Sequence, residues 1–146
     1  IIQKYPYDHP IELVVDCPAG MDDVQIPRML LQPIVENAIF HGIAPLDDKG
    51  VIRVVIRRQQ EDAMIHIEDN GIGIEPEKLA GLLDYERNRS KQGMTHIGLS
   101  HVHQTVRLYY GSRYGLNVER KEEGGTRVTI LIPANGGDIH VQSAAR

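Results

Sequence analysis

Two segments with alternating apolar and polar residues, VIRVVIRRQ (51–59) and DAMIHIEDN (62–70), are separated by a short turn. This period of two, together with many β-branched residues, is typical of strands that bury one face. A connection this short joins antiparallel neighbours. The chain is therefore expected to contain an antiparallel hairpin with one apolar face, which other elements must cover.

The same two periodicities predict the remaining elements. Strand patterns fall at 11–16, 114–121 and 126–133, and helical spacing falls at 27–41, 75–84 and 98–111. Gly42 is expected to end the first helix, and Tyr109 is expected on the buried face of the last. This order predicts an α/β two-layer sandwich, with a mixed, mostly antiparallel sheet of about five strands covered on one face by about three helices.

Composition limits the functions that this chain of 146 residues can carry. Its net charge of −4 argues against a nucleic-acid surface. A polyanionic ligand would therefore need local positive potential from backbone N–H groups, a metal ion or a few basic side chains. Cys17 is the only cysteine, so no internal disulfide is expected, which fits a reducing compartment. We expect one domain over 1–136 and a flexible tail over 137–146.

Asp69 ends the second strand of the hairpin, on the face that Ile65 and Ile67 share. If that face is the core, a carboxylate points inward and needs a donor such as the exocyclic amine of a purine. Gly71 and Gly73 follow, and glycines allow the backbone to approach a flat ligand closely. An Asp-Asn-Gly turn between two elements is the alternative. A Rossmann site is excluded because no third glycine follows at the required spacing.

Asn37 lies near the edge of the apolar face of the first predicted helix, where asparagine is unfavourable. A neutral amide oxygen at this position can ligate Mg²⁺ without adding charge near phosphates. His41 lies one turn further along the same face and within reach of the same ligand. A buried helix with ordinary polar residues at its boundary explains this segment equally well.

A polar stretch at 85–97 precedes the last helix, and stretches of this length in compact chains are often functional loops. The free N–H groups at the helix start, around Gly98, form a potential anion site. Thr126 opens the final strand and faces inward with Val128, where its hydroxyl could bind a water or Asp69. A hairpin turn followed by a strand-favouring threonine is the simpler alternative.

Taken in order, these segments resemble the Bergerat-fold ATPases, which include gyrase, Hsp90, MutL and the histidine kinases. The matching segments are LQPIVENAIFHGI (31–43) for the asparagine box, DNGIGI (69–74) and HIGLSHV (96–102) for the two glycine boxes, and GGTRVTILIP (124–133) for the closing strand. The first segment, together with IQKYPY and RLYYG, is most similar to the LytS/YesM-like subgroup of sensor histidine kinases.

The resemblance implies ATP and Mg²⁺ as ligands. Asn37 would hold Mg²⁺ against the triphosphate, Glu36 would order water around the metal, and Asp69 would accept the adenine amine. The other nucleotide-binding positions that it implies are His41, Gly71, Gly73, Ile74, His96, Ile97, Gly98, Leu99 and Thr126. Residues 85–97 would form a lid over the nucleotide.

The chain departs from the family pattern at several positions, which include Pro33, Phe40 and His96. Hydrolysing members carry a glutamate four residues before the magnesium asparagine, where this chain has Pro33, which cannot act as a base. Phe40 replaces a lysine that often contacts phosphate, and His96 replaces a glycine. Pro33 disfavours an ATP hydrolase with a dimer clamp. Phe40 and His96 leave a degenerate, non-enzymatic nucleotide-binding or docking module as the alternative to a kinase.

The resemblance also implies partners. The phosphoacceptor histidine of such kinases lies in an upstream dimerisation domain, and none of the seven histidines here has the matching sequence context. The chain is thus expected to be a catalytic half that acts on its own upstream domain, within a full-length homodimer that passes the phosphoryl group to a response regulator. We expect a cytoplasmic domain of a membrane-anchored bacterial sensor, with no direct contact to membrane or nucleic acid.

Overall fold

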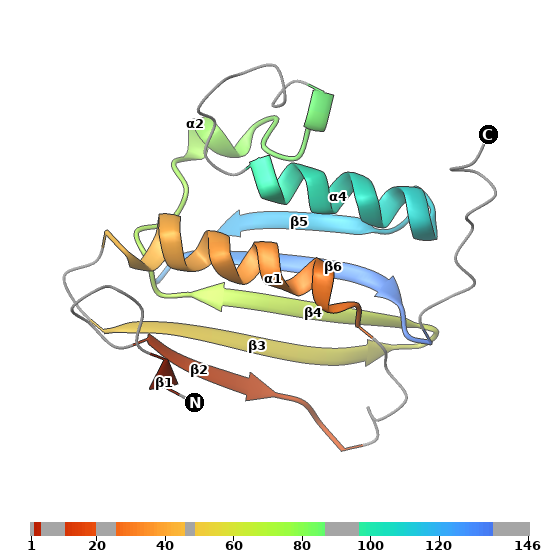
Figure 1. Cartoon of the computed structure of the whole chain (residues 1–146), viewed down its shortest axis with the longest axis horizontal. Coiled ribbons are helices and arrows are strands. Elements are labelled where there is room, and N and C mark those ends of the chain that lie inside the picture. The colour runs from red at the N-terminus through yellow and green to blue at the C-terminus, as the bar shows by residue number, and fades with distance from the viewer. Residues whose placement is uncertain (1, 4–10, 20–25, 46–48, 87–96, 136–146) are drawn as a thin grey trace.

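The computed structural model describes residues 2–3, 11–19, 26–45, 49–86 and 97–135. These residues form one layer of sheet and one layer of helices, as the sequence predicts (Figure 1). The expected tail at 137–146 lies outside the described residues, as do residues 87–96 of the expected lid.

A single sheet runs in the order β1-β2-β3-β4-β6-β5. Its strands are β1 (Ile2–Gln3), β2 (Ile11–Asp16), β3 (Gly50–Gln59), β4 (Asp62–Asp69), β5 (Gly115–Arg120) and β6 (Thr126–Pro133). The predicted hairpin is confirmed as β3 and β4, which pair antiparallel in the register Val54 to Ile67. β2 and β3 pair in parallel, which the helical crossover between them makes possible. β1 is a two-residue edge strand that the sequence patterns did not predict.

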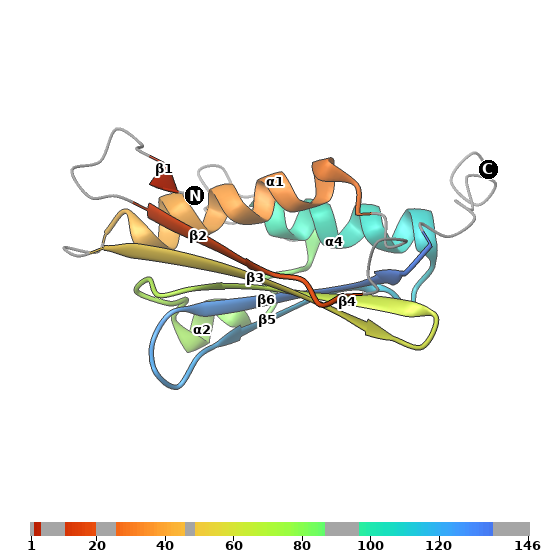
Figure 2. The same cartoon turned by 90° about the horizontal axis from the view of Figure 1, so that it is seen from below.

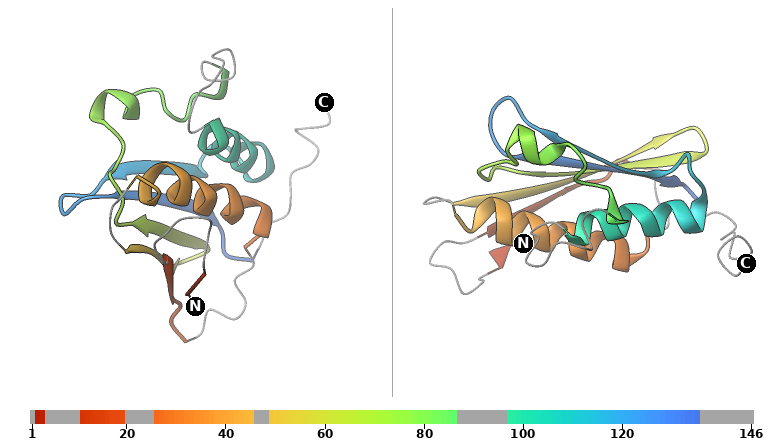
Figure 3. Two further views of the ribbon diagram at one scale, coloured as in Figure 1. Left: turned by 60° about the vertical axis from the view of Figure 1, so that its left-hand side comes forward. Right: turned by 90° about the horizontal axis from the view of Figure 1, so that it is seen from above.

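Two long helices cover one face of the sheet. The helical elements are α1 (Arg28–Asn37), the π-helix η1 (Ala38–Ile43), α2 (Pro76–Leu79) and α4 (Ile97–Tyr110). Figure 2 shows α1 and α4 side by side on the same face of the sheet. α2 lies beyond the β5 edge instead of over that face (Figures 1 and 3). No helix in the described ranges is long and apolar enough to cross a membrane.

The core lies between these helices and the sheet, because alternation sends one side chain in two toward them. The most deeply buried side chains include Ile34, Ile65, Ile67, Leu99, Ile130 and Ile132. The opposite face carries ion pairs such as Arg57 with Asp16 and Arg127 with Glu68. Such a face tolerates solvent, so one layer of helices is sufficient.

The structure corrects three local predictions. Helical backbone does not end at Gly42 but continues through η1, where the N–H of Ala44 donates to the carbonyl of Ile39 at 2.8 Å. The helix predicted over 75–84 covers only four residues, α2. Tyr109 is exposed, and Tyr110 packs against the core instead. Apolar spacing alone does not show which of two neighbouring tyrosines at the end of a helix is the buried one.

Ile130 tests the position of the core. Its side chain is 0% exposed on β6, whereas that of Val15 on β2 is 59% exposed. We expect Ile130→Ala to lower the free energy of unfolding by about 2–5 kcal/mol, because it leaves a cavity. Val15→Ala, the matched control, should cost less than about 1 kcal/mol. Urea titration followed by circular dichroism measures both, and equal losses would contradict this packing.

Candidate functional site

Asp69 lies at the carboxyl end of β4, and its side chain is 5% exposed on the helix-covered face. Oδ1 accepts hydrogen bonds from the backbone N–H of Gly71 at 2.8 Å and of Thr126 at 3.3 Å. Both bonds that described residues donate to this carboxylate end on Oδ1. Oδ2 is thus the oxygen that these described donors leave for an external donor. The inward carboxylate that alternation predicts is present.

Glycines bring three backbone segments against Asp69. A Cβ added at Gly42 would lie 2.9 Å from Oδ1 of Asp69, and one at Gly71 would lie 2.3 Å from the carbonyl of Gly42. The N–H of Ile72 also donates to that carbonyl at 3.0 Å, which ties η1 to the loop after β4. At Gly125 a Cβ would meet the carbonyl oxygen of Asp69 at 2.0 Å, and φ is +91°. No larger residue fits this approach without displacing the backbone.

Burial sets the electrostatics of Asp69. It raises the pKa of the carboxyl above its ordinary value of 3.8, because the charged form loses hydration. The backbone N–H groups of Gly71 and Thr126, and then the charge of Lys121, lower the same pKa and offset part of this effect. The protein therefore tolerates a costly buried carboxylate by surrounding it with donors.

Asn37 is the last residue of α1, and the chain passes directly from it into η1. π-Helical segments are rare and occur frequently at functional sites. Here η1 carries Phe40, which is exposed, and His41, which is half-buried. The next residue of η1, Gly42, packs against the side chain of Asp69. Burial lowers the pKa of His41, which favours its neutral imidazole. The predicted asparagine segment thus reaches the same end of the molecule as Asp69.

Glu36 lies beside Asn37 in the chain but is exposed. Its Oε1 accepts a hydrogen bond from Nε2 of Gln32 at 3.0 Å, one turn earlier in α1. Its predicted role in ordering water around a metal ion stays a prediction.

The start of α4 packs against α1. A Cβ added at Gly98 would lie 3.8 Å from Cβ of Pro33, and Asn37 lies one turn further along α1 from Pro33. Leu99 is fully buried, so it anchors this first turn of α4 in the core. Ile97 begins the helix, and His96 lies outside the described residues. The first described turn of α4 and the turn of α1 that ends at Asn37 therefore belong to neighbouring helices.

Thr126 and Ile74 complete the surroundings of Asp69. Thr126 is 4% exposed, and the bond that it makes to Asp69 comes from its backbone N–H, whereas the sequence suggested its hydroxyl. Ile74 is buried, and Gly73 has a φ of +78°. Asn70 turns away, because its side chain bonds the backbone of Val51 and Lys49.

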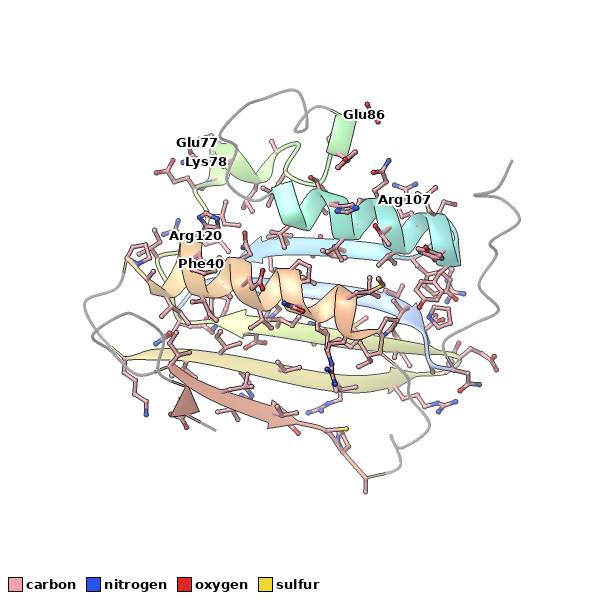
Figure 4. All side chains as sticks on the ribbon, in the orientation of Figure 1. Phe40, Glu77, Lys78, Glu86, Arg107 and Arg120 are labelled. Carbon is pink, nitrogen blue, oxygen red and sulfur yellow. The ribbon has the colours of Figure 1, made fainter. Side chains whose placement is uncertain are left out.

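Two cations near this site were not predicted from the sequence. Nζ of Lys121 lies 3.4 Å from the carbonyl oxygen of Asp69, and Nη1 of Arg120 lies 3.4 Å from that of Ile74. Figure 4 shows Arg120 at the end of the molecule where Phe40 also lies. The pairing of β5 with β6, and of β6 with β4, brings these residues beside the loop after β4, so no local sequence signal could have found them.

A cavity of about 780 Å³ lies elsewhere, between residues 79–86, α4 and β5. Its described lining includes Leu82, His103 and Arg107 but neither Asp69 nor Asn37. His103 is held there by the N–H of Leu116, which donates to its Nδ1 at 2.9 Å. The volume of a cavity alone therefore does not identify the site that the sequence motifs form.

Residues 22–136 match the model of the histidine kinase-, DNA gyrase B- and HSP90-like ATPase family. The chain therefore belongs to this family of ATPases. Among its relatives are sensor histidine kinases, and the predicted resemblance to them is confirmed.

Sensor histidine kinase YpdA from Escherichia coli is 39% identical over 108 residues, which cover 74% of this chain and 18% of that protein. An uncharacterized sensor-like histidine kinase from Staphylococcus epidermidis is 33% identical over 132 residues, 90% of this chain and 25% of that protein. The chain thus spans a quarter or less of the length of these two relatives.

Solved structures with the same fold include the mycobacterial sensor histidine kinase MprB, with a TM-score of 0.58 and 20% identity over 84% of this chain and 81% of that one. The histidine kinase domain of a blue-light activated kinase from Erythrobacter litoralis has a TM-score of 0.55, also at 20% identity, over 85% of this chain and 55% of that one. The predicted two-layer fold is confirmed.

The raised pKa of Asp69 predicts a gain in stability from Asp69→Asn. A group whose pKa is raised on folding favours the folded state below its unfolded pKa, and this contribution is lost as the pH rises through the folded pKa. At pH 7 the buried charge is therefore a cost that Asn removes, while its amide oxygen can still accept from Gly71 and Thr126. We expect a higher free energy of unfolding for the variant at pH 7, and a difference that shrinks as the pH falls and vanishes below 3.8.

Urea titrations at several pH values from 7 down to below 3.8 measure this difference. Glu77→Gln, the same acid-to-amide change at an exposed residue of α2, is the control and should change little. A variant that is less stable than wild type at pH 7 would contradict the assignment of Asp69 as a buried carboxylate under strain from desolvation.

Proposed function

We propose that this chain is the ATP-binding catalytic domain of a two-component sensor histidine kinase. It delivers the γ-phosphoryl group of ATP to a histidine in an upstream dimerisation domain outside this chain. The observation that carries the proposal is the buried Asp69, whose Oδ1 is held by two backbone donors while Oδ2 remains for the adenine amine. The family match and the sensor histidine kinases among the relatives support it.

The loop after β4 recognises the base. Oδ2 of Asp69 accepts from the exocyclic amine, and Gly71, Gly73 and Ile74 provide the backbone and side chain against which the ring lies. Thr126 contributes by holding Oδ1 through its N–H. Because the carboxylate accepts and does not donate, adenine is favoured over a purine with an oxygen at the same position.

The adjacent turns of α1 and α4 bind the phosphates and the metal ion. Asn37 supplies an amide oxygen to Mg²⁺, with water and phosphate oxygens as the other ligands, which is how this ion is usually held in nucleotide sites. The described residues contain no cluster of three acidic, histidine or cysteine side chains that could hold a metal. The N–H groups of Ile97, Gly98 and Leu99 meet the phosphates, together with neutral His41.

Catalysis in this domain is positioning and charge neutralisation, since phosphoryl transfer needs little covalent work from the protein. Pro33 occupies the position at which the hydrolysing relatives have their water-activating glutamate, so transfer to a histidine is favoured over hydrolysis. Glu36, exposed beside Asn37, orders water around the metal. The acceptor histidine and the homodimer belong to the full-length protein, and a response regulator takes the phosphoryl group.

We place the domain in the cytoplasm, as part of a membrane-anchored sensor, without direct contact to membrane or nucleic acid. A degenerate nucleotide-binding or docking module is the second candidate. It is favoured by Phe40, which is exposed on η1 where relatives often carry a phosphate-binding lysine. Binding and autophosphorylation distinguish the two.

Asp69→Asn tests the base assignment. The amide nitrogen would take the place of Oδ2 and present a donor to the amine of adenine, so ATP affinity should fall about tenfold or more. The same donor suits the 6-oxo group of inosine triphosphate, whose affinity should hold or rise. Calorimetry with Mg²⁺ and each nucleotide measures both constants, with Glu77→Gln as control. Unchanged ATP binding would exclude this role of Asp69.

The kinase step needs the acceptor. A protein that contains this domain and its upstream helices should incorporate the γ-phosphate of ATP into an acid-labile phosphohistidine. Asn37→Ala should abolish this incorporation, because Mg²⁺ loses its protein ligand. Saturable ATP binding without any phosphorylation would favour the degenerate module.

A further inference from the structure

The hairpin formed by β5, residues 121–125 and β6 contacts the loop from Asp69 to Ile74 at four points. The N–H of Thr126 holds Oδ1 of Asp69, and Gly125 abuts its carbonyl. Lys121 and Arg120 add one contact each, at opposite ends of the loop. Base recognition depends on this loop, so what holds it is relevant to nucleotide choice.

Lys121 contacts the first residue of the loop, Asp69. Its side chain is 11% exposed, and Nζ lies 3.4 Å from the carbonyl oxygen of Asp69. The ammonium also lies 3.5 Å from a carboxylate oxygen of Glu123 and 4.0 Å from one of Glu68. A lysine that gives up most of its hydration loses rotamer freedom, so it occupies one defined position.

Arg120 contacts the last residue of the loop, Ile74. Nη1 lies 3.4 Å from the carbonyl oxygen of Ile74, to which it donates. A Cβ added at Gly73 would lie 3.4 Å from Cζ and 3.5 Å from Cγ of Arg120. The side chain of Arg120 therefore lies along the backbone of Gly73, in the part of the loop that glycine makes most pliable.

We propose that Arg120 and Lys121 are positioning residues that set base specificity, by fixing the two ends of the Asp69–Ile74 loop so that Oδ2 of Asp69 is aimed at the exocyclic amine of adenine. This inference rests on the proposed nucleotide site. Neither side chain needs to touch the nucleotide. Their effect is on the direction of one carboxylate oxygen, and hydrogen bonds weaken steeply when their geometry is lost.

The test compares the affinities of ATP and inosine triphosphate in Arg120→Ala and Lys121→Met, by calorimetry with Mg²⁺ on this chain. Wild type should bind ATP about tenfold more tightly than inosine triphosphate, the loss expected for one hydrogen bond to a charged group. Each variant should weaken ATP severalfold and leave inosine triphosphate nearly unchanged, so that the ratio approaches one. Arg120→Lys and Lys121→Arg should recover part of the ratio.

Arg57→Ala is the matched control, because Arg57 lies on the opposite face of the sheet and pairs with Asp16. A merely structural role for the two cations would weaken both nucleotides alike and lower the thermal midpoint. Arg120 is exposed, so Arg120→Ala carries the test if Lys121→Met does not fold. An unchanged ratio in folded variants overturns the positioning role alone, whereas failure of wild type to bind ATP overturns the proposed function with it.

Discussion

The buried carboxylate of Asp69 is the constraint on which the arrangement of this domain depends. A charge at 5% exposure is unfavourable unless donors surround it, and the chain supplies them from the backbone of two different segments. Backbone donors cannot be moved independently of the fold, so the loop after β4 and the start of β6 must meet at this point. Glycine at 42, 71 and 125 is the consequence, since these approaches leave no room for a side chain.

The same contact connects the proposed base site to the place proposed for the phosphates. Gly42 belongs to η1, which continues α1 directly, so the position of Asn37 follows from the packing of Gly42 on Asp69 and Gly71. α4 in turn packs its first turn on α1 through Gly98 and Pro33. Pro33, at the position where the resemblance places a catalytic glutamate in hydrolysing members, thus faces the start of α4.

Affinity and stability oppose each other at Asp69. Burial raises its pKa, which means that the ionised form required by the proposed adenine contact is the form that the folded state disfavours. Lys121 lowers the same pKa from the neighbouring hairpin and so shifts the balance toward function. Sites of this kind are typical of proteins that give up some stability for recognition.

The sequence by itself determined the elements and most of the candidate site. Alternation predicted β3 and β4 and the inward Asp69, and helical spacing predicted α1 and α4, because these patterns are local. The order of the motifs predicted the family. Tertiary structure alone decided that η1 continues past Gly42, that the backbone N–H of Thr126 donates to Asp69, and that Arg120 and Lys121 lie beside the loop. These depend on pairing between β5, β6 and β4 and on close backbone approaches, and such long-range contacts leave no periodic signal in the chain.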